Sequence, residues 1–378
     1  MTQSRPTNEL KPNWKQVALF LGLTFGLTYS LNLFLYLTSG YGANAGTTSL
    51  LQVQMLIPAA VAIILQLFVF RDSRIYRLQE RPRWFFYVYL AFVLVLLALA
   101  LSLLLNPNQI YQIIASALVQ ALLIGLLIFV VILRVISGKE SFERTGLSVG
   151  KFRYWITFGL LIVGIYAAMT GLNALFRLGQ PVDIREMLAQ TAGGQPSGLE
   201  MIPNWLLLAI VGFQAVILGP LLGLPIAFGE EYGWRGYLQG QLVRLGKVRG
   251  ILLVGAIWGL WHAPIIAMGH NYPGYPVTGI LLMTVYTIEL AFIFGYAVLK
   301  SGSIWLAALL HALNNQVLAF LIAAVYRPDD PVFSFGTGIY GLIVLAVVVV
   351  ALLVFDRKTW LSPKASASDE NVSTESDI

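Results

Sequence analysis

Two adjacent carboxylates and an arginine lie at the end of a long apolar stretch, at Glu230, Glu231 and Arg235. A carboxylate near the middle of a bilayer costs at least ~2.5–3.5 kcal/mol, so a membrane protein that keeps two side by side is expected to use them. On a helix, Glu231 and Arg235 share one face and can form an ion pair because they are four residues apart. Glu230 points about 100° away from Glu231 and is left for another partner. Taken alone, the ion pair could also be purely structural.

Two of the three histidines, His262 and His311, lie within apolar stretches. At about 1.5 Å per residue, they lie roughly 18 and 14 Å from the inner ends of their expected helices, and Glu230 lies roughly 15 Å from the end of its own. The three side chains are therefore expected at a common depth. Each histidine alone could simply bond a neighbouring helix.

Asn315 follows His311 by one helical turn, so both side chains can donate toward a single oxygen atom, as an oxyanion hole requires. Pro220 and Pro225 precede the glutamates and are expected to kink or open that helix. Such breaks are tolerated where they line a cavity, so we expect a water pocket at this level.

Two further polar residues belong to no such set. His270 is followed by the loop-forming residues 271–274, so we expect it in an outer loop. Glu289 is expected near the plane of the other polar groups. It could pair with Arg235 or a histidine, or help to hydrate the cavity.

The composition is that of an all-α polytopic membrane protein. The chain is 58% hydrophobic and 11% charged, whereas soluble domains are roughly 25% charged. It has no cysteine, which excludes disulfides, thiol catalysis and Cys-ligated zinc. The net charge of +6 comes from basic residues in short loops, so we expect no nucleic-acid partner.

Apolar stretches of about 20 residues, enough to cross a bilayer, occur ten times. They cover 17–37, 50–70, 84–105, 111–133 and 155–176, and five more begin at Trp205, Ile251, Val277, Ile304 and Ile339. With the N-terminus inside, 21 of the 24 basic residues fall on the cytoplasmic side. We therefore predict a transmembrane bundle of about ten helices with both termini cytoplasmic, in a bacterial plasma membrane.

The same pattern predicts the domain organisation. A cytoplasmic tail (1–16) precedes an accessory five-helix half (17–176), and an outer loop (177–204) that could be a lid or a linker leads to a catalytic half (205–355). The tail 356–378 is rich in Ser and acidic residues, so we expect it to be cytoplasmic and mostly disordered.

Three motifs in the second half resemble those of a known family. They are Glu230-Glu231-x-x-x-Arg235, Trp258-x-x-x-His262 and His311-x-x-x-Asn315. In order and spacing they are similar to the motifs of the CAAX protease and bacteriocin-processing family, also called the Abi family of intramembrane proteases. The resemblance covers about 205–325. One departure is Trp258, where the family commonly has Phe, a change expected to alter packing more than chemistry.

The resemblance implies an intramembrane endopeptidase. In such an enzyme Glu230 would activate a water molecule that His262 helps to hold, and His311 with Asn315 would stabilise the oxyanion. The residues that would orient the site are Glu231 and Arg235. The implied substrates are membrane-embedded, lipid-modified (CAAX-type) or leader peptides.

Zinc is the alternative to a metal-free site, because Glu230, His262 and His311 form a His₂Glu set of ligand types. Against zinc, the chain has no His-Glu-x-x-His helix, and the ligands would come from three separate helices. We therefore expect no cofactor. Two other functions stay open: a proton-coupled transporter, in which Glu and His form a relay, and a non-proteolytic immunity or regulatory membrane protein.

Overall fold

The computed structural model describes residues 11–38, 40, 45–78, 80–106, 108–191 and 201–361. Most of the predicted terminal tails, 1–10 and 362–378, lie outside these residues. The described chain is almost entirely helical, and its single sheet joins two short antiparallel strands, β1 (Gly179–Pro181) and β2 (Tyr326–Pro328). The chain is thus an all-α helical bundle, as its composition predicts.

Helices occupy all ten predicted positions. In the first half they are α1 (Trp14–Thr38), α2 (Ala45–Ile64) with η2 (Leu65–Val69), α3 (Arg74–Arg77), η3 (Arg81–Arg83), α4 (Trp84–Leu105), α5 (Gln109–Ser137), α6 (Lys139–Arg144) and α7 (Phe152–Leu175). After β1 follow α8 (Ile184–Thr191), α9 (Asn204–Phe213), η5 (Gln214–Leu218), α10 (Gly219–Glu231), η6 (Tyr232–Leu238), α11 (Gln239–Leu242) and η7 (Val243–Leu245). The last are α12 (Lys247–Trp261), α13 (Ala263–Ala267), α14 (Pro276–Ser301), α15 (Ile304–Phe320), η8 (Leu321–Val325), α16 (Ile339–Phe355) and α17 (Arg357–Leu361).

Eight helical segments of the described chain are long and apolar enough to cross a membrane. Two of the predicted spans are shorter helices, since α12 has 15 residues and α16 has 17. These spans indicate an integral, multi-pass membrane protein.

The helix that carries the glutamates is continuous from Asn204 to Leu245, contains two π-helical segments and ends in the 3-10 turn η7. The π-helical segment η5 directly precedes Pro220, whose ring would clash with the preceding turn of a regular helix. A second π-helical segment, η6, begins immediately after Glu231. Inserted π turns re-aim side chains and are frequent at functional sites. The predicted opening is therefore found as a π-helical turn before Pro220, whereas Pro225 lies within the regular α10.

Glycine pairs let the site helices approach closely. A Cβ at Gly229 would lie 2.5 Å from the backbone oxygen of Met55, and one at Gly233 would lie 2.4 Å from Pro58. These contacts press α10 and η6 against α2. A second pair four residues apart, Gly255 and Gly259, presses α12 against α14 in the same way. Small residues with this spacing are the usual means of close helix packing in membranes.

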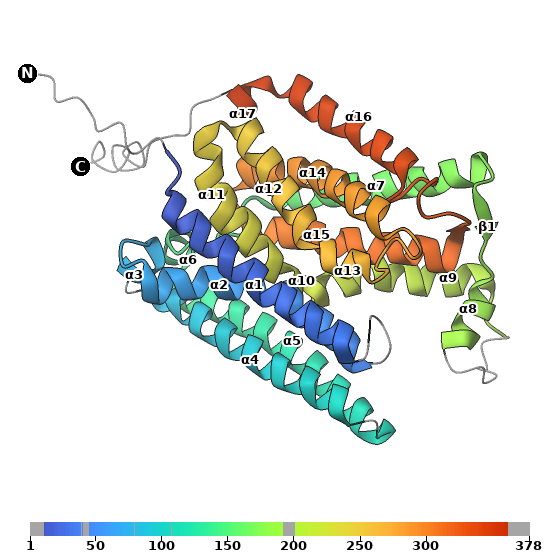
Figure 1. Ribbon diagram of the computed structural model, residues 1–378, viewed down its shortest axis with the longest axis horizontal. Helices are drawn as coiled ribbons and strands as arrows, with labels where there is room; N and C mark the ends of the chain where they lie inside the picture. The colour runs from blue at the N-terminus through green and yellow to red at the C-terminus, as the bar shows by residue number, and fades with distance from the viewer. Residues whose placement is uncertain are drawn as a thin grey trace, which may run out of the picture.

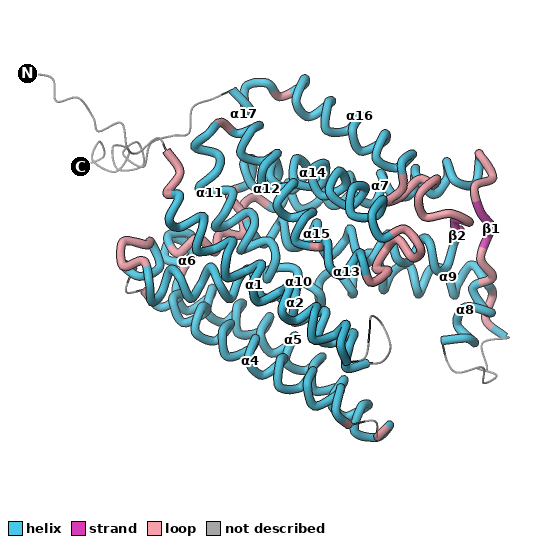
Figure 2. Tube along the Cα trace, in the orientation of Figure 1, coloured by secondary structure: helices cyan, strands magenta, loops and turns pink. Residues whose placement is uncertain are grey.

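The two predicted halves pack into one bundle. In Figure 1, α1, α2 and α4 lie along the helices of the second half, and α2 contacts α10 directly. Figure 2 shows that connections gather at the two ends of the bundle. The predicted outer loop, 177–204, is not wholly irregular because it contains β1 and α8, while 192–200 lie outside the described residues. The proposed domain boundaries stay a prediction.

Candidate active site

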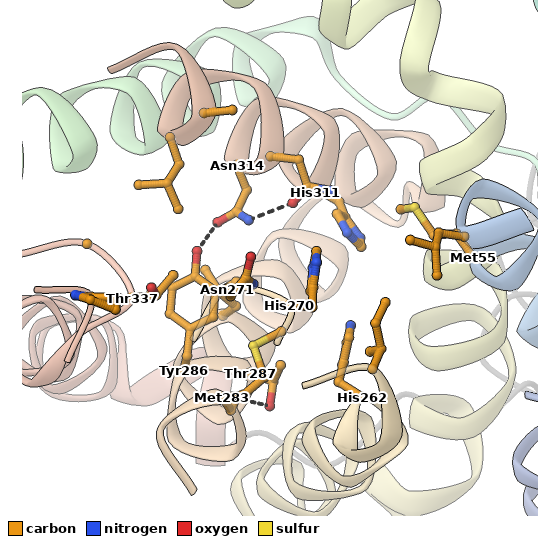
Figure 3. Close-up of a pocket in the computed structure, with 18 of the residues that line it drawn as sticks. Met55, His262, His270, Asn271, Met283, Tyr286, Thr287, His311, Asn314 and Thr337 are labelled. Carbon is orange, nitrogen blue, oxygen red and sulfur yellow. Dashed lines mark hydrogen bonds between the residues drawn. The ribbon is translucent and has the colours of Figure 1, made fainter. Parts of the chain in front are cut away.

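A cavity of about 700 Å³ lies between α2, α10, α12, α14 and α15. Its wall includes the three residues that the sequence placed at a common depth, Glu230, His262 and His311, and also Asn315. The structure therefore brings together side chains from three separate helices, and Figure 3 shows the histidines around one space. Residues of α2, such as Thr48 and Met55, complete the wall, so the first half contributes to the pocket.

The two neighbouring glutamates have different partners because successive helical residues point about 100° apart. Glu230 faces the cavity, and its Oε2 accepts a 2.5 Å hydrogen bond from Nε1–H of Trp258. Glu231 is fully buried, and its Oε1 accepts from Nη1 of Arg235 at 2.9 Å. The ion pair predicted from the four-residue spacing is present. It lies behind the cavity wall, so Glu231 and Arg235 do not line the pocket in the described chain.

His311 is fixed by Glu231. Its Nδ1 lies 2.8 Å from Oε1 of that carboxylate, which can only accept, so Nδ1 carries a hydrogen. The ring is almost fully buried and lines the cavity. Anchoring at Nδ1 leaves Nε2 for a substrate group, and it sets the ring orientation in the way that carboxylate–histidine pairs do at other sites.

His262 is fixed by its own helix. Its Nδ1 lies 2.8 Å from the backbone oxygen of Trp258, so Nδ1–H is the donor. In the neutral ring Nε2 is then an acceptor. The ring of Trp261 packs edge-on against His262 with centroids 4.7 Å apart, which holds the imidazole in place. With Nδ1–H engaged in both His262 and His311, the Nε2 atom of each neutral ring is an acceptor.

Trp258 corrects an expectation. Its indole was expected to differ from the family's usual Phe mainly in packing, yet its N–H donates to Glu230, a bond that Phe cannot make. The same ring lies over the guanidinium of Arg235 at 4.1 Å, and Phe294 lies at 5.2 Å on the same cation. These aromatic faces stabilise a buried arginine by cation–π attraction. Trp258 thus contacts two of the three charged residues of the first motif, Glu230 and Arg235.

Asn315 is oriented by a neighbour that the sequence did not single out. Asn314 is buried, and its Oδ1 accepts hydrogen bonds from the hydroxyl groups of Tyr166 and Tyr286. Its Nδ2 donates to Oδ1 of Asn315 at 3.0 Å. With its oxygen engaged, Asn315 has its amide hydrogens available on the cavity wall. Tyr166 comes from α7, far away in the sequence, which is why spacing alone gave no sign of this chain of contacts.

His270 lies in the expected loop between α13 and α14, yet it also lines the cavity. Figure 3 shows its ring in the same space as those of His262 and His311. Burial lowers the pKa of His270 to about 4. The sequence missed this residue because a loop that folds back over a pocket has no periodic pattern.

Glu289 does not take part. It is buried on α14, but it forms no ion pair with Arg235 or a histidine among the described residues. Its Oε2 has no hydrogen-bond partner within that part of the chain. The side chain does not line the cavity. The pairing considered from the sequence is therefore not found.

No three His, Asp or Glu side chains gather closely enough to hold a metal ion anywhere in the described residues. This includes the set considered from the sequence, Glu230, His262 and His311. One oxygen of Glu230 is also engaged by the indole N–H of Trp258. As they stand, the described side chains do not form a zinc-ligand set.

Comparisons with known proteins agree with the motifs. Residues 204–317, which contain all three motifs, match the family model of the type II CAAX prenyl endopeptidase Rce1-like proteins. The chain is also similar to a CAAX prenyl protease 2 of Methanococcus maripaludis, with 29% identity over 147 residues. That match covers 36% of this chain and 49% of the archaeal protein, so the chain spans about half the length of this relative. No solved structure matches the chain.

Proposed function

We propose that the chain, in which residues 204–317 belong to the Rce1-like family of type II CAAX prenyl endopeptidases, is an intramembrane endopeptidase. The observation that supports this most is the shared cavity of Glu230, His262, His311 and Asn315. A base, a water-holding acceptor and two donors on one wall are the parts that peptide hydrolysis needs.

In the proposed reaction, a water molecule donates one hydrogen to the carboxylate of Glu230 and the other to Nε2 of His262. The water oxygen attacks the carbonyl carbon of the peptide while Glu230 takes its proton, as a general base does. The indole N–H of Trp258 holds the second oxygen of Glu230 in place during this step. Water is thus both bound and activated within the membrane-embedded pocket.

The carbonyl oxygen becomes an oxyanion, which His311 and Asn315 would hold by donating from Nε2–H and Nδ2–H. For His311 to donate from Nε2 while Nδ1–H contacts Glu231, its ring must be an imidazolium. The site then holds two carboxylates, Arg235 and one imidazolium, so its charges balance. Glu230 finally returns its proton to the leaving nitrogen as the C–N bond breaks, which gives a new carboxyl and a new amino terminus.

The proposed substrates are membrane-attached polypeptides. Prenylated C-terminal segments, which the name of the archaeal relative denotes, are one such class. Leader peptides and transmembrane segments are the others. Hydrolysis inside a cavity lined by apolar helices favours chains that already lie at the membrane, because a soluble peptide would have to leave water to reach Glu230.

The proposal is tested with purified protein and a library of transmembrane, leader and prenylated peptides, with products read by mass spectrometry. We expect at least one peptide to be cut at an internal bond into two fragments with new termini. If no class of peptide is cut by folded protein in detergent and in lipid, the proposed activity is wrong.

We further propose that the reaction needs no metal ion, since each residue of the three motifs already has a role. Exhaustive chelation, with residual metal counted by mass spectrometry, tests this. Turnover is expected to persist at well below one metal ion per chain. A tightly bound zinc whose removal abolishes turnover and whose return restores it would contradict the metal-free mechanism.

A further inference from the structure

The mouth of the cavity is formed by two connections. One joins α13 to α14 (268–275) and the other joins β2 to α16 (329–338). The hydroxyl of Tyr272 donates to the backbone oxygen of Thr337 at 2.7 Å, and that of Tyr275 donates to Asp330 at 3.2 Å. These bonds tie the two connections into one rim, which we call the rim loops. In the described chain, every loop residue that lines the cavity belongs to the rim loops or lies next to them in the sequence.

The opposite end of the bundle carries the basic charge. In Figure 1, α3, α6 and α17 lie at one end, and β1 with α8 lies at the other. The connections at the first end contain most of the basic residues, at 71–83, 134–153, 244–249 and 357–358. The connections at the rim end contain three arginines within the described residues, Arg177, Arg185 and Arg327. Because cytoplasmic loops hold the excess of Lys and Arg, the rim loops face the outer side.

The cavity does not extend to the basic end, because its lining on the glutamate helix stops at Glu230 and its lining on α15 starts at His311. Phe228 and Trp305 are buried and stacked with centroids 4.4 Å apart. Beside them, Arg235 is covered by Trp258 and Phe294. Close-packed interiors of this kind leave no passage for a polypeptide. A substrate therefore reaches Glu230 past the rim loops or through the membrane, and not from the basic end.

The wall of the cavity is mainly apolar, and the charged groups that it carries in the proposed mechanism are Glu230 and His311. It includes neutral amide and hydroxyl groups, such as Gln52, Gln54, Asn271 and Thr337. No Lys or Arg lines it within the described chain. A terminal carboxylate buried there would meet no Lys or Arg, and the charge of His311 is already paired with Glu231, so burying the carboxylate is costly. The wall thus suits the neutral backbone of an internal segment better than a chain end.

We propose that the cavity takes an internal, uncharged segment of a membrane-anchored polypeptide from the outer, non-cytoplasmic side of the membrane. This rests on the proposed endopeptidase function and narrows its substrates. It removes prenylated C-terminal peptides on the cytoplasmic face from the substrate range of this chain, since they meet the closed basic end and end in a carboxylate.

The orientation is tested by cysteine labelling in a chain that has no cysteine of its own. Pro273 lies on the exposed rim, and Lys139 lies exposed in α6 at the basic end. In intact cells, a membrane-impermeant maleimide is expected to label Pro273→Cys, whereas Lys139→Cys is labelled only after permeabilisation. The reverse pattern would overturn the inference, whatever the protein's activity.

The substrate side is tested with the Lys139→Cys protein in sealed lipid vesicles, whose orientation its label reports. Two fluorogenic peptides are compared: a lipid-anchored peptide with an uncharged internal segment, and a farnesylated peptide with a free C-terminal carboxylate. We expect turnover of the first when it is on the rim side and loss of turnover when it is on the basic side. Cleavage of the farnesylated peptide from the basic side would contradict the inference alone. If neither peptide is cleaved in vesicles or in detergent, the proposed endopeptidase function is contradicted. The cysteine labelling does not depend on activity, so it would still show to which side of the membrane the cavity opens.

Discussion

The side chain of Trp258 contacts two charged residues at once. Its N–H contacts Glu230 and its ring covers Arg235, so it connects the base of the proposed reaction with the ion pair behind it. Phe at this position would keep the ring and lose the donor. The effect of the N–H can therefore be separated from the effect of packing by one conservative substitution.

Trp258→Phe is expected to lower kcat by about tenfold and to leave the fold intact, because a hydrogen bond to a charged group contributes about 1.5–3 kcal/mol at most. KM should change little, since the indole N–H is bonded to Glu230 and not aimed at the substrate. Steady-state kinetics and thermal unfolding of the two proteins measure both effects. An unchanged kcat with normal stability would show that the Trp258 N–H does not position the base.

Asn315→Ala is expected to lower the rate by about 10²–10³-fold while sparing the fold, as the loss of one oxyanion donor does. The matched control is Gln316→Ala, an amide one residue further along that does not line the cavity. The measurement is the rate at which each variant cleaves a peptide that is a substrate of the unmodified protein. Equal losses in both variants would mean that the helix, and not the Asn315 amide, is what the substitutions disturb.

Sequence spacing could predict contacts within one helix but not those between helices. The Glu231–Arg235 pair follows from a separation of four residues. The bond from His311 to Glu231 joins residues 80 positions apart, and only packing of α15 on α10 creates it. The role of Asn314 was hidden for the same reason, because its partner Tyr166 lies on α7.

At the scale of elements, the glycines of α10 and η6 decide how near α2 can come. Gly229 and Gly233 have no room for a Cβ, whereas Gly26 in α1 has nothing within 4 Å of that position. The approach matters for the site because α2 supplies one wall of the cavity. The length of each apolar stretch predicts a helix, but it does not predict which helices are in contact.

Gly233→Ala is expected to destabilise the protein by about 1–3 kcal/mol, the usual cost of overpacking. It should also lower turnover, because α2 must move away from η6. Gly26→Ala, the matched change at an open helical position, should be neutral or stabilising by up to about 1 kcal/mol. Unfolding in mixed detergent measures both. Equal stability of the two variants would contradict the close contact between Gly233 and Pro58.

At the scale of the whole molecule, the cavity lies within the bundle, is lined at one end by the rim loops and does not extend to the basic end. The sequence could predict the class of fold and the number of apolar stretches, because each stretch is long enough to recognise alone. It could not predict that the loop with His270 folds over the cavity, nor that α2 and α7 of the first half reach the site. Those features depend on long-range packing.

The buried glutamates allow the most direct test of hydrolysis by a glutamate-activated water. Glu230 and Glu289 are both buried in membrane-spanning helices, but only Glu230 lines the cavity. The measurement compares the rates at which the Glu230→Gln and Glu289→Gln variants cleave the same substrate peptide. The folded fraction of each variant is measured alongside. Glu230→Gln is expected to lose about 10²–10⁴-fold, as removal of a general base does, and Glu289→Gln to keep turnover close to that of the unmodified protein. Full turnover by folded Glu230→Gln would contradict the role of Glu230 as the base.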